Sequence, residues 1–269
     1  MTDMLKWFAS LAVLAVFSAS GAMASGGGEH KLKHEHWHFD GVFGTYDKAA
    51  AQRGFQIYQE VCSACHGLKY VAFYNLADEG APFYDPEFPN SNESPVVKAL
   101  AKQFTITDGP DDSGDMFDRP GLTSDKLPSP FANDMAAKAS NGGALPPDLS
   151  LITRARHDGS NYVYSLLTGY IDTPHGMEIA AGMNYNPMFA GGDQIAMAQP
   201  LYEGSVEYTD GTEASVEQMA KDVTEFLTWA ADPKMEQRKR TGWMVMIYLF
   251  LLSLLLYGSY RAVWRDVEH

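Results

Sequence analysis

The sequence predicts a mainly α-helical protein with long loop insertions and one C-terminal transmembrane helix. Several segments place apolar residues at helical spacing, whereas no stretch is rich in the alternation that is typical of strands. The chain contains 14 prolines and 24 glycines, which indicates long connecting loops. Its 269 residues are enough for one sizeable domain and additional segments.

The N-terminus predicts a secretory signal peptide over residues 1–24. Lys6 supplies a positive charge, and the apolar run at residues 7–17 is too short to span a bilayer. Residues 22–24, Ala-Met-Ala, form a cleavage site of the small-x-small type. The stretch contains no arginine, which argues against a mitochondrial presequence. We therefore expect the mature chain to begin near Ser25.

The exported domain is predicted to cover residues 25–234 and to begin with an extended Gly- and His-rich segment. Residues 45–61 then predict a helix, because Phe55, Tyr58 and Val61 recur at helical spacing. This helix leads directly to the pair of cysteines.

A second helix is predicted to begin at Ser94 and Pro95, a cap residue followed by a first-turn proline. Residues 105–150 are rich in Pro, Gly and Asp and predict a long surface excursion. Residues 161–169 predict a short helix, and residues 216–230 predict an amphipathic one. The segments between them predict loops.

The anchor helix is predicted over residues 235–262, followed by a cytoplasmic tail at residues 263–269. No charged residue lies between Arg240 and Arg261, and about 20 apolar residues suffice to cross the roughly 30 Å hydrocarbon layer. Trp243 at one end, with aromatic residues at the other, fits the two membrane interfaces. The alternative for this run is a buried core helix.

The signal peptide sets the predicted orientation, with the exported domain in the periplasm of a bacterium and a single span in the inner membrane. Residues 238–240 are basic and lie on the outer side, against the positive-inside tendency. Large domains are translocated regardless of such charges, so the signal peptide decides.

The charge balance limits the possible partners. Acidic residues outnumber basic ones by 34 to 20, giving a formal net charge of −14. This argues against nucleic acid and favours cationic partners. No Ser/His/Asp triad, Gly-rich phosphate loop or catalytic carboxylate pair stands out, so we expect no catalysis by the chain alone.

The only two cysteines lie in a C-x-x-C-H pattern, with Cys62 and Cys65 followed by His66. Two thiols on one helical turn can each bind one vinyl group of a porphyrin, and the next residue can place its imidazole under the iron. A zinc site would need two further ligands, and no second cysteine pair exists. A redox C-x-x-C would not need His66. The pattern predicts one covalently attached haem c.

The second axial ligand is not decided by spacing. Met177, Met183, Met188 and Met197 are all candidates, although a methionine in a Met-rich sequence more often serves packing. A methionine ligand would favour electron transfer, whereas an open iron position would favour a haem enzyme or a gas sensor.

Several long motifs carry a family resemblance. RGFQIYQEVCSACHGLKYVAFYNLADE (53–79) resembles the haem-attachment region of cytochrome c1, the haem subunit of the quinol–cytochrome c oxidoreductase, complex III. Residues 108–121, 141–170 and 191–233 resemble the same family, as does the basic pair before a single C-terminal anchor. The resemblance covers nearly all of the mature chain and fits the bacterial type. It implies a cytochrome-c-like haem domain.

The resemblance also implies site residues. The family's axial methionine falls in an I-A-M-A-x-P segment and matches Met197, which with His66 would complete the two axial ligands. The haem-propionate arginine matches Arg156. Haem-packing positions match Pro146, Pro147 and Tyr162. The plainer readings are a surface arginine for Arg156, and turn rigidity and a core aromatic for the other three.

The function that the resemblance implies is one-electron transfer. The haem subunit accepts an electron from the Rieske iron–sulfur subunit and passes it to a soluble basic c-type cytochrome, beside cytochrome b in the respiratory or photosynthetic complex. The alternatives are a stand-alone membrane-tethered cytochrome, or a haem enzyme or sensor with an open iron site.

Two further clusters have competing interpretations. His30, His34, His36 and His38 could chelate zinc or copper, but a solvated extended segment that packs through neighbouring Trp37 and Phe39 is the better reading. The acidic run at residues 108–118 is either a solvated turn or a docking surface for the basic acceptor. Glu203, Glu207 and Asp210 are an alternative docking surface.

Overall fold

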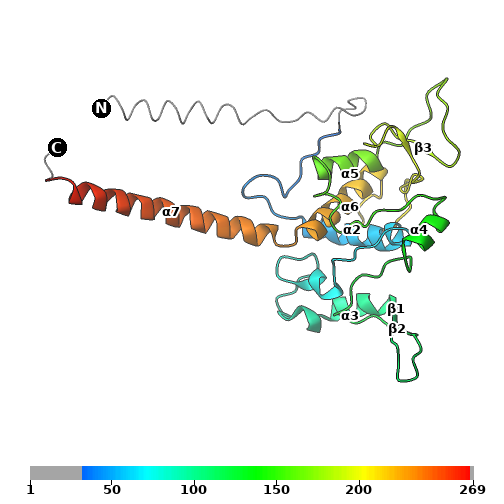
Figure 1. Ribbon diagram of the computed structural model, residues 1–269, viewed down its shortest axis with the longest axis horizontal. Coiled ribbons are helices and arrows are strands. Elements are labelled where there is room, and N and C mark those ends of the chain that lie inside the picture. The colour runs from blue at the N-terminus through cyan, green and yellow to red at the C-terminus, as the bar shows by residue number, and fades with distance from the viewer. Residues whose placement is uncertain (1–31, 267–269) are drawn as a thin grey trace.

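The computed structural model describes residues 32–266, so the predicted signal peptide and His30 lie outside the described residues. Helices α2, α5 and α6 lie side by side in the domain, and α7 extends away from it as one long helix (Figure 1). Short elements and loops fill the rest. The helices and strands are α2 Lys48–Glu60, α3 Pro95–Lys102, β1 Thr105–Asp108, β2 Phe117–Pro120, α4 Asp134–Ser140, α5 Gly159–Leu167, β3 Asn184–Tyr185, β4 Gln194–Ile195, α6 Val216–Ala231 and α7 Met235–Val263.

The core lies between α2 and α6. Phe55 and Tyr58 of α2 contact Phe226 of α6, with ring centroids 5.5 and 6.0 Å apart. Gly54 permits this close approach, because a Cβ at this position would lie 2.1 Å from the backbone oxygen of Asp222. These contacts bury the apolar faces of both helices and hold α2 in place.

The predicted helices are confirmed, with shifts of one to three residues at their ends. Capping explains several starts. Asp47 accepts a hydrogen bond from the Ala50 N–H at the start of α2, and Ser215 accepts one from the Gln218 N–H at the start of α6. Pro95 is the first residue of α3, as its position after Ser94 predicts.

The surface excursion at residues 105–150 contains more order than the sequence predicts. Strands β1 and β2 form an antiparallel hairpin in which Thr105 pairs with Pro120 and Asp108 with Phe117, and α4 follows it. Arg119 of β2 donates to the carboxylates of Asp108 and Asp125. The strands are four residues long and exposed, so hydrophobic alternation gave no signal.

The segment before α2 packs on the domain through its aromatic residues, as predicted. Trp37 and Phe39 are buried and stack with ring centroids 5.3 Å apart. The Trp37 indole N–H donates to Asn161 Oδ1 of α5 at 2.9 Å. The segment is extended and forms no strand with a neighbour in the part of the chain that is described.

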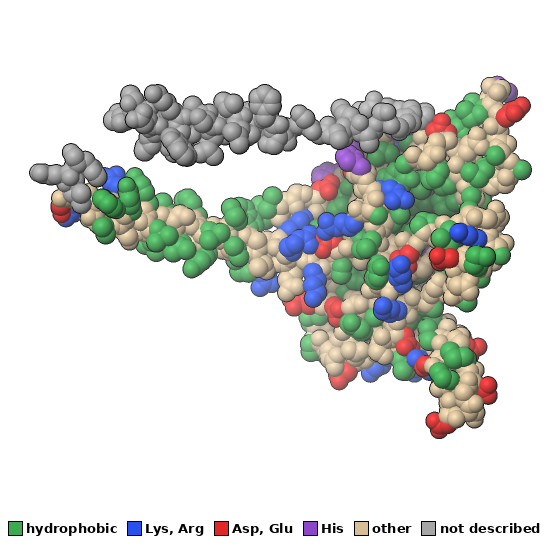
Figure 2. Space-filling view, viewed as in Figure 1, with side chains coloured by type: hydrophobic (Ala, Val, Ile, Leu, Met, Phe, Trp, Pro, Cys, Tyr) green, Lys and Arg blue, Asp and Glu red, His purple; other side chains and the backbone are tan. Residues whose placement is uncertain are grey.

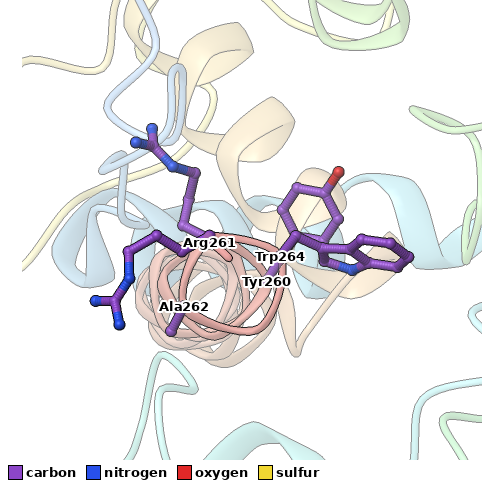
Figure 3. A pocket seen from close by; sticks show the side chains of 5 residues that line it. Tyr260, Arg261, Ala262 and Trp264 are labelled. Carbon is purple, nitrogen blue, oxygen red and sulfur yellow. The ribbon is translucent and has the colours of Figure 1, made fainter. Parts of the chain in front are cut away.

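Helix α7 is long and apolar enough to cross a membrane, and it is the one such helix among residues 32–266. Its most apolar stretch is not buried in the domain, which contradicts the alternative of a buried core helix. Near its far end the rings of Tyr260 and Trp264 lie together, 6.3 Å between centroids, while Arg261 points to another side of the helix (Figure 3). Such an aromatic pair is typical of a membrane interface.

Candidate haem-binding site

The motif cysteines follow directly from the end of α2. The chain tightens into a short 3-10 turn, Cys62–Ala64, in which the N–H groups of Cys65 and His66 both donate to the Cys62 carbonyl at 3.1 and 2.9 Å. This turn displays the two side chains and the imidazole on consecutive positions of one compact segment. The rigid α2–α6 core therefore fixes where the motif begins.

Both cysteine thiols are free. Cys62 is half-buried and Cys65 is exposed. Burial raises the pKa of the Cys62 thiol to about 12, so the neutral thiol is the stable form there. No disulfide joins the two cysteines, so both sulfurs remain available for thioether bonds to a porphyrin.

The His66 ring is oriented by a backbone carbonyl. Its Nδ1 lies 2.7 Å from the Pro147 carbonyl oxygen, an acceptor, so Nδ1 carries the proton and Nε2 keeps its lone pair. Desolvation lowers the pKa of His66, although the Pro147 hydrogen bond opposes it. A neutral imidazole with a free Nε2 is the form that ligates iron.

The carbonyl of Pro147 is held by the proline loop, residues 146–150, which docks on the residues after His66. The Leu149 N–H donates to the Gly67 carbonyl at 2.9 Å. The backbone N–H of Lys69 donates to Asp148 Oδ2 at 3.0 Å, and that of Tyr70 to Ser150 Oγ at 3.1 Å. The loop thus acts as a second support for the His66 ring.

Met197 lies just beyond β4, in a segment held by its backbone. The Tyr170 hydroxyl donates to the Met197 carbonyl at 3.0 Å, and the Asn184 side chain donates to the same oxygen at 3.4 Å. The half-buried side chain is thereby carried on a fixed main chain.

The other candidate methionines are placed differently. Met188 packs against the end of α5, since a Cβ on Gly169 would lie 2.7 Å from its Cγ. Met177 lies on an exposed stretch and is itself 41% exposed. Met183 is half-buried, and its N–H closes a turn with the Ala180 carbonyl at 3.0 Å. Packing against the end of α5 therefore accounts for Met188.

The remaining predicted site residues differ in burial. Arg156 is exposed, and it donates to the neighbouring Ala155 carbonyl. Tyr162 on α5 is buried, and its hydroxyl accepts from the Ala190 N–H at 3.5 Å. Pro146 is half-buried, while Pro147 is exposed and acts through its carbonyl.

The residues present fit a haem. Two unpaired thiols can form the bonds to the porphyrin vinyl groups. An oriented imidazole and a methionine thioether are ligands that suit haem iron. Leu145 and Leu151, which flank the proline loop, are 44% and 46% exposed, and Ile171 is 59% exposed. Figure 2 shows hydrophobic side chains that line a hollow between the segment with β3 and the segment with α4. A porphyrin face would cover such apolar surface.

Of the histidine cluster, His34, His36 and His38 lie among the described residues. Among the described residues no group of three or more His, Cys, Asp or Glu side chains could hold a metal ion. His34 instead lies 3.1 Å from the Asn161 amide and 3.5 Å from the Asp158 carboxylate. Its neighbours are therefore structural partners on α5.

Three supporting residues were not singled out from the sequence. Asp148 holds the proline loop, while Tyr170 and Asn184 hold the Met197 carbonyl. The Asp-Leu-Ser sequence at 148–150 is a turn signal that could have indicated the first, since Asp148 Oδ1 accepts from the Ser150 N–H. Tyr170 and Asn184 bind the Met197 carbonyl from distant positions in the sequence, so no local sequence pattern indicates them.

Comparisons with known proteins agree with these observations. A model of the Cytochrome C1 family matches residues 37–267. The chain is 42% identical over 285 residues to cytochrome c1 of Rhodospirillum rubrum, covering 100% of both. It is 45% identical over 261 residues to a mitochondrial cytochrome c1 heme protein of Arabidopsis thaliana, 95% of this chain and 80% of that one. It is 43% identical over 288 residues to cytochrome b/c1 of Bradyrhizobium diazoefficiens; the match takes in 97% of this chain, which spans 40% of that protein.

Proposed function

The chain belongs to the cytochrome C1 family, and from this premise we propose that it is the one-electron carrier subunit of a quinol–cytochrome c oxidoreductase. The observation that carries the proposal is the His66 ring, whose Nδ1 is fixed 2.7 Å from the Pro147 carbonyl beside two free cysteines. A site built only for a disulfide has no need of an oriented imidazole, and a thiol activated by a neighbouring histidine would have a lowered pKa, whereas the pKa of Cys62 is raised.

A bound haem c would supply one reversible electron at its iron. The chain's own residues bind and orient it. Cys62 and Cys65 would attach it covalently, and the protonated Nδ1 of His66 leaves Nε2 to point at the metal. The proline loop restrains the ring, so that little rearrangement accompanies a change of charge at the iron.

We assign the second axial position to Met197. Its carbonyl is held by Tyr170 and Asn184, so the main chain that carries the thioether is restrained. Among residues 32–266 Arg156 bonds only to its neighbour Ala155, so its exposed guanidinium is available for a haem propionate. Pro146, Pro147 and Tyr162 would pack around the cofactor.

The ligand assignment has a matched test. Met197→Leu should lower the reduction potential and open the iron to carbon monoxide, because the thioether stabilises the ferrous state. Met183→Leu should do neither. The two variants are compared by potentiometric titration and by carbon monoxide difference spectra. The reverse pattern would assign the ligand to Met183.

The proposed partners are the other core subunits of the complex. The printed name of the Bradyrhizobium relative joins cytochrome b to c1, which supports cytochrome b as a neighbour of this chain. By family membership the electron would arrive from the Rieske iron–sulfur subunit and leave to a soluble, basic c-type cytochrome. The formal charge of −14 favours a cationic acceptor.

The proposed location is the bacterial inner membrane, with the haem domain in the periplasm. Helix α7 would be the anchor, and its basic turn at residues 237–240 would lie on the periplasmic side. The signal peptide at residues 1–24 and the tail at 263–269 complete this arrangement as predictions.

Purification in mild detergent tests the assignment. Co-isolation with cytochrome b and a Rieske protein would support it. Isolation alone, with the haem retained, would instead favour a stand-alone tethered cytochrome.

In the same preparation, the haem should remain with the chain on a denaturing gel, and the double variant Cys62→Ala and Cys65→Ala should lose the haem stain. Extraction of haem from the unmodified chain by acid–acetone would contradict covalent attachment.

A further inference from the structure

A turn at residues 41–44 presents two bulky apolar side chains to solvent. Val42 is 62% exposed and Phe43 is 75% exposed. Gly41 has a φ of +71°, which favours glycine, and a Cβ on Gly44 would lie 2.1 Å from the Asp40 carbonyl oxygen. The two glycines therefore allow a tight turn that points Val42 and Phe43 away from the core.

This turn is fastened to the start of α7. The Lys239 ammonium group donates to the carbonyl oxygens of Phe39 at 2.7 Å and Gly44 at 3.1 Å, and so bridges the two ends of the turn. The Phe43 ring stacks on Trp243, with centroids 5.4 Å apart and planes 29° from parallel. Figure 1 shows the blue segment looping out beside the beginning of α7.

A groove of about 780 Å³ lies between the turn and one face of α7. Val42 and Phe43 line one side, and Trp243, Met244 and Ile247 line the other. Its charged end holds Lys239, Arg240 and the Glu236 carboxylate, which accepts from the Tyr46 N–H. Arg240 is exposed and has no partner in the described chain. From Arg240 to Ile247 the helix rises about 10 Å, so the groove runs from charged to apolar surroundings.

We propose that the turn at residues 41–44 is a second membrane contact, with Val42 and Phe43 entering the lipid interface beside Trp243. The occupant of the groove is a phospholipid, its acyl chain along Met244 and Ile247 and its phosphate at Arg240. The proposal rests on the membrane placement of α7 in the proposed function. Trp243 is the first aromatic residue of the apolar run, which sets the turn at interfacial depth.

The consequence is a fixed tilt of the domain. A single helix leaves an attached domain free to lean toward or away from the bilayer. A turn fastened by Lys239 beside Trp243 would restrict that freedom, because the domain then meets the membrane through the turn as well as through α7. The electron donor and acceptor would find the haem at a constant height.

Spin labelling of the full-length holoprotein in phospholipid nanodiscs tests this. The native cysteines are taken up by haem, so Phe43→Cys gives one labelling site. Oxygen concentrates in the bilayer and a nickel chelate in water. We expect the oxygen-to-nickel accessibility ratio to be higher at position 43 than at Met135→Cys, a control on α4 that is 77% exposed. An equal or lower ratio at position 43 would overturn the proposal.

The fastening by Lys239 has its own control. Lys239→Met should lower the ratio at position 43, because the turn loses both hydrogen bonds. Lys234→Met removes the same charge at an exposed site just before α7 and should leave the ratio unchanged. A label at position 43 that is shielded from both reagents would mean that protein, not lipid, covers the turn. More than one label per chain would show failed haem attachment, and the depth is then read in Cys62→Ser with Cys65→Ser.

Discussion

The two ends of α2 are held by different chemistry. At the membrane-side end, carboxylates bind the backbone: Glu225 Oε1 accepts from the Asp47 N–H and Glu236 Oε1 from the Tyr46 N–H, each at 2.8 Å. At the haem-side end, neutral groups bind the backbone of His66 and Gly67, and the Asp148 carboxylate binds it further along, at Lys69. The Tyr58 hydroxyl donates to the His66 carbonyl at 3.2 Å, and the Leu149 N–H donates to the Gly67 carbonyl.

This difference separates two tasks. The membrane-side end joins α2 to α6 and α7, and it uses a buried carboxylate whose charge depends on pH. The haem-side end keeps the His66 ring in one orientation through the neutral Pro147 carbonyl. The pH dependence that the structure predicts therefore lies at the membrane-side end, where Glu225 is buried.

The largest effect on stability should come from the middle of α2, where the close contact of Gly54 with α6 holds the helix in place. Gly54→Val would drive a side chain into the Asp222 backbone, whose oxygen lies 2.1 Å from the position of an added Cβ. Overpacking against backbone that cannot yield should cost about 3 kcal/mol or more. Denaturant unfolding of the holoprotein measures the loss.

The exposed residue Ala49 on the same helix provides the matched control. Ala49→Val adds a β-branched side chain where there is space and should cost less than about 1 kcal/mol. Equal stability losses in both variants would mean that α2 and α6 do not meet at Gly54.

At the membrane-side end, Glu225 should make stability depend on pH. Burial raises the pKa of Glu225 from 4.5 to about 7. Between these values the unfolded chain releases a proton that the folded chain keeps, so stability is full below pH 4.5 and falls until about pH 7. The predicted fall is about 3 kcal/mol at most.

Glu225→Gln should remove this dependence, because the amide oxygen can still accept from Asp47 and never ionises. The variant should match the unmodified protein near pH 5 and exceed its stability near pH 8, as measured by denaturant unfolding across this range. Glu217→Gln, at an exposed position of α6, should leave the pH dependence unchanged. A flat curve for the unmodified protein would contradict the argument.

At the haem-side end, Asp148→Ala should lower stability. The carboxylate accepts from the N–H groups of Lys69 and Ser150, both at 3.0 Å. Their loss should cost about 1–2 kcal/mol. Asp148→Asn keeps one acceptor oxygen and should lose less. An Asp148→Ala variant as stable as the unmodified protein would mean that this carboxylate does not hold the proline loop in place.

Local sequence signals account for α2 and the residues attached to it. Helical spacing predicted the helix, Asp47 caps it, and Cys62, Cys65 and His66 stand in a pattern that has few other meanings. Pro147 was chosen through the family resemblance as a packing residue. Its hydrogen bond to the His66 ring spans 81 positions, and no spacing rule reaches so far.

Long-range contacts explain what the sequence did not predict. The β1–β2 hairpin has no apolar face that a sequence pattern could show. Its paired strands are also joined by polar side chains, as where Thr107 donates to Asp118. In the sequence, Glu225 is an ordinary residue of a predicted helix. Only the fold places its carboxylate at the start of α2, where it accepts from the Asp47 N–H. Such effects come from the meeting of two helices and not from either alone.

The smallest effect should be on the approach of a cationic acceptor to the haem-side half of α2. The acidic segment 203–210 is bonded to this helix: Gln56 donates to the Glu207 carbonyl at 3.1 Å, and Arg53 pairs with Asp210 at 2.9 Å. The β1–β2 hairpin also has an acidic tip but joins the chain beside α3, through Gly121 and Phe104. Figure 1 shows it projecting well away from α2.

Charge steering therefore favours segment 203–210, which follows Met197 and adjoins α2. Glu203 and Glu207 are exposed, whereas the Asp210 charge is shared with Arg53. Electron transfer to a basic soluble cytochrome should slow as salt shortens the Debye length from roughly 30 Å at 0.01 M to about 8 Å at 0.15 M.

Glu203→Gln with Glu207→Gln should flatten this salt dependence, and the rate of electron transfer at low salt should fall by up to about 10-fold. Asp112→Asn with Asp115→Asn should change it less, and stopped-flow rates at several salt concentrations compare the pairs. An unchanged slope in both would mean that docking at neither surface is electrostatic.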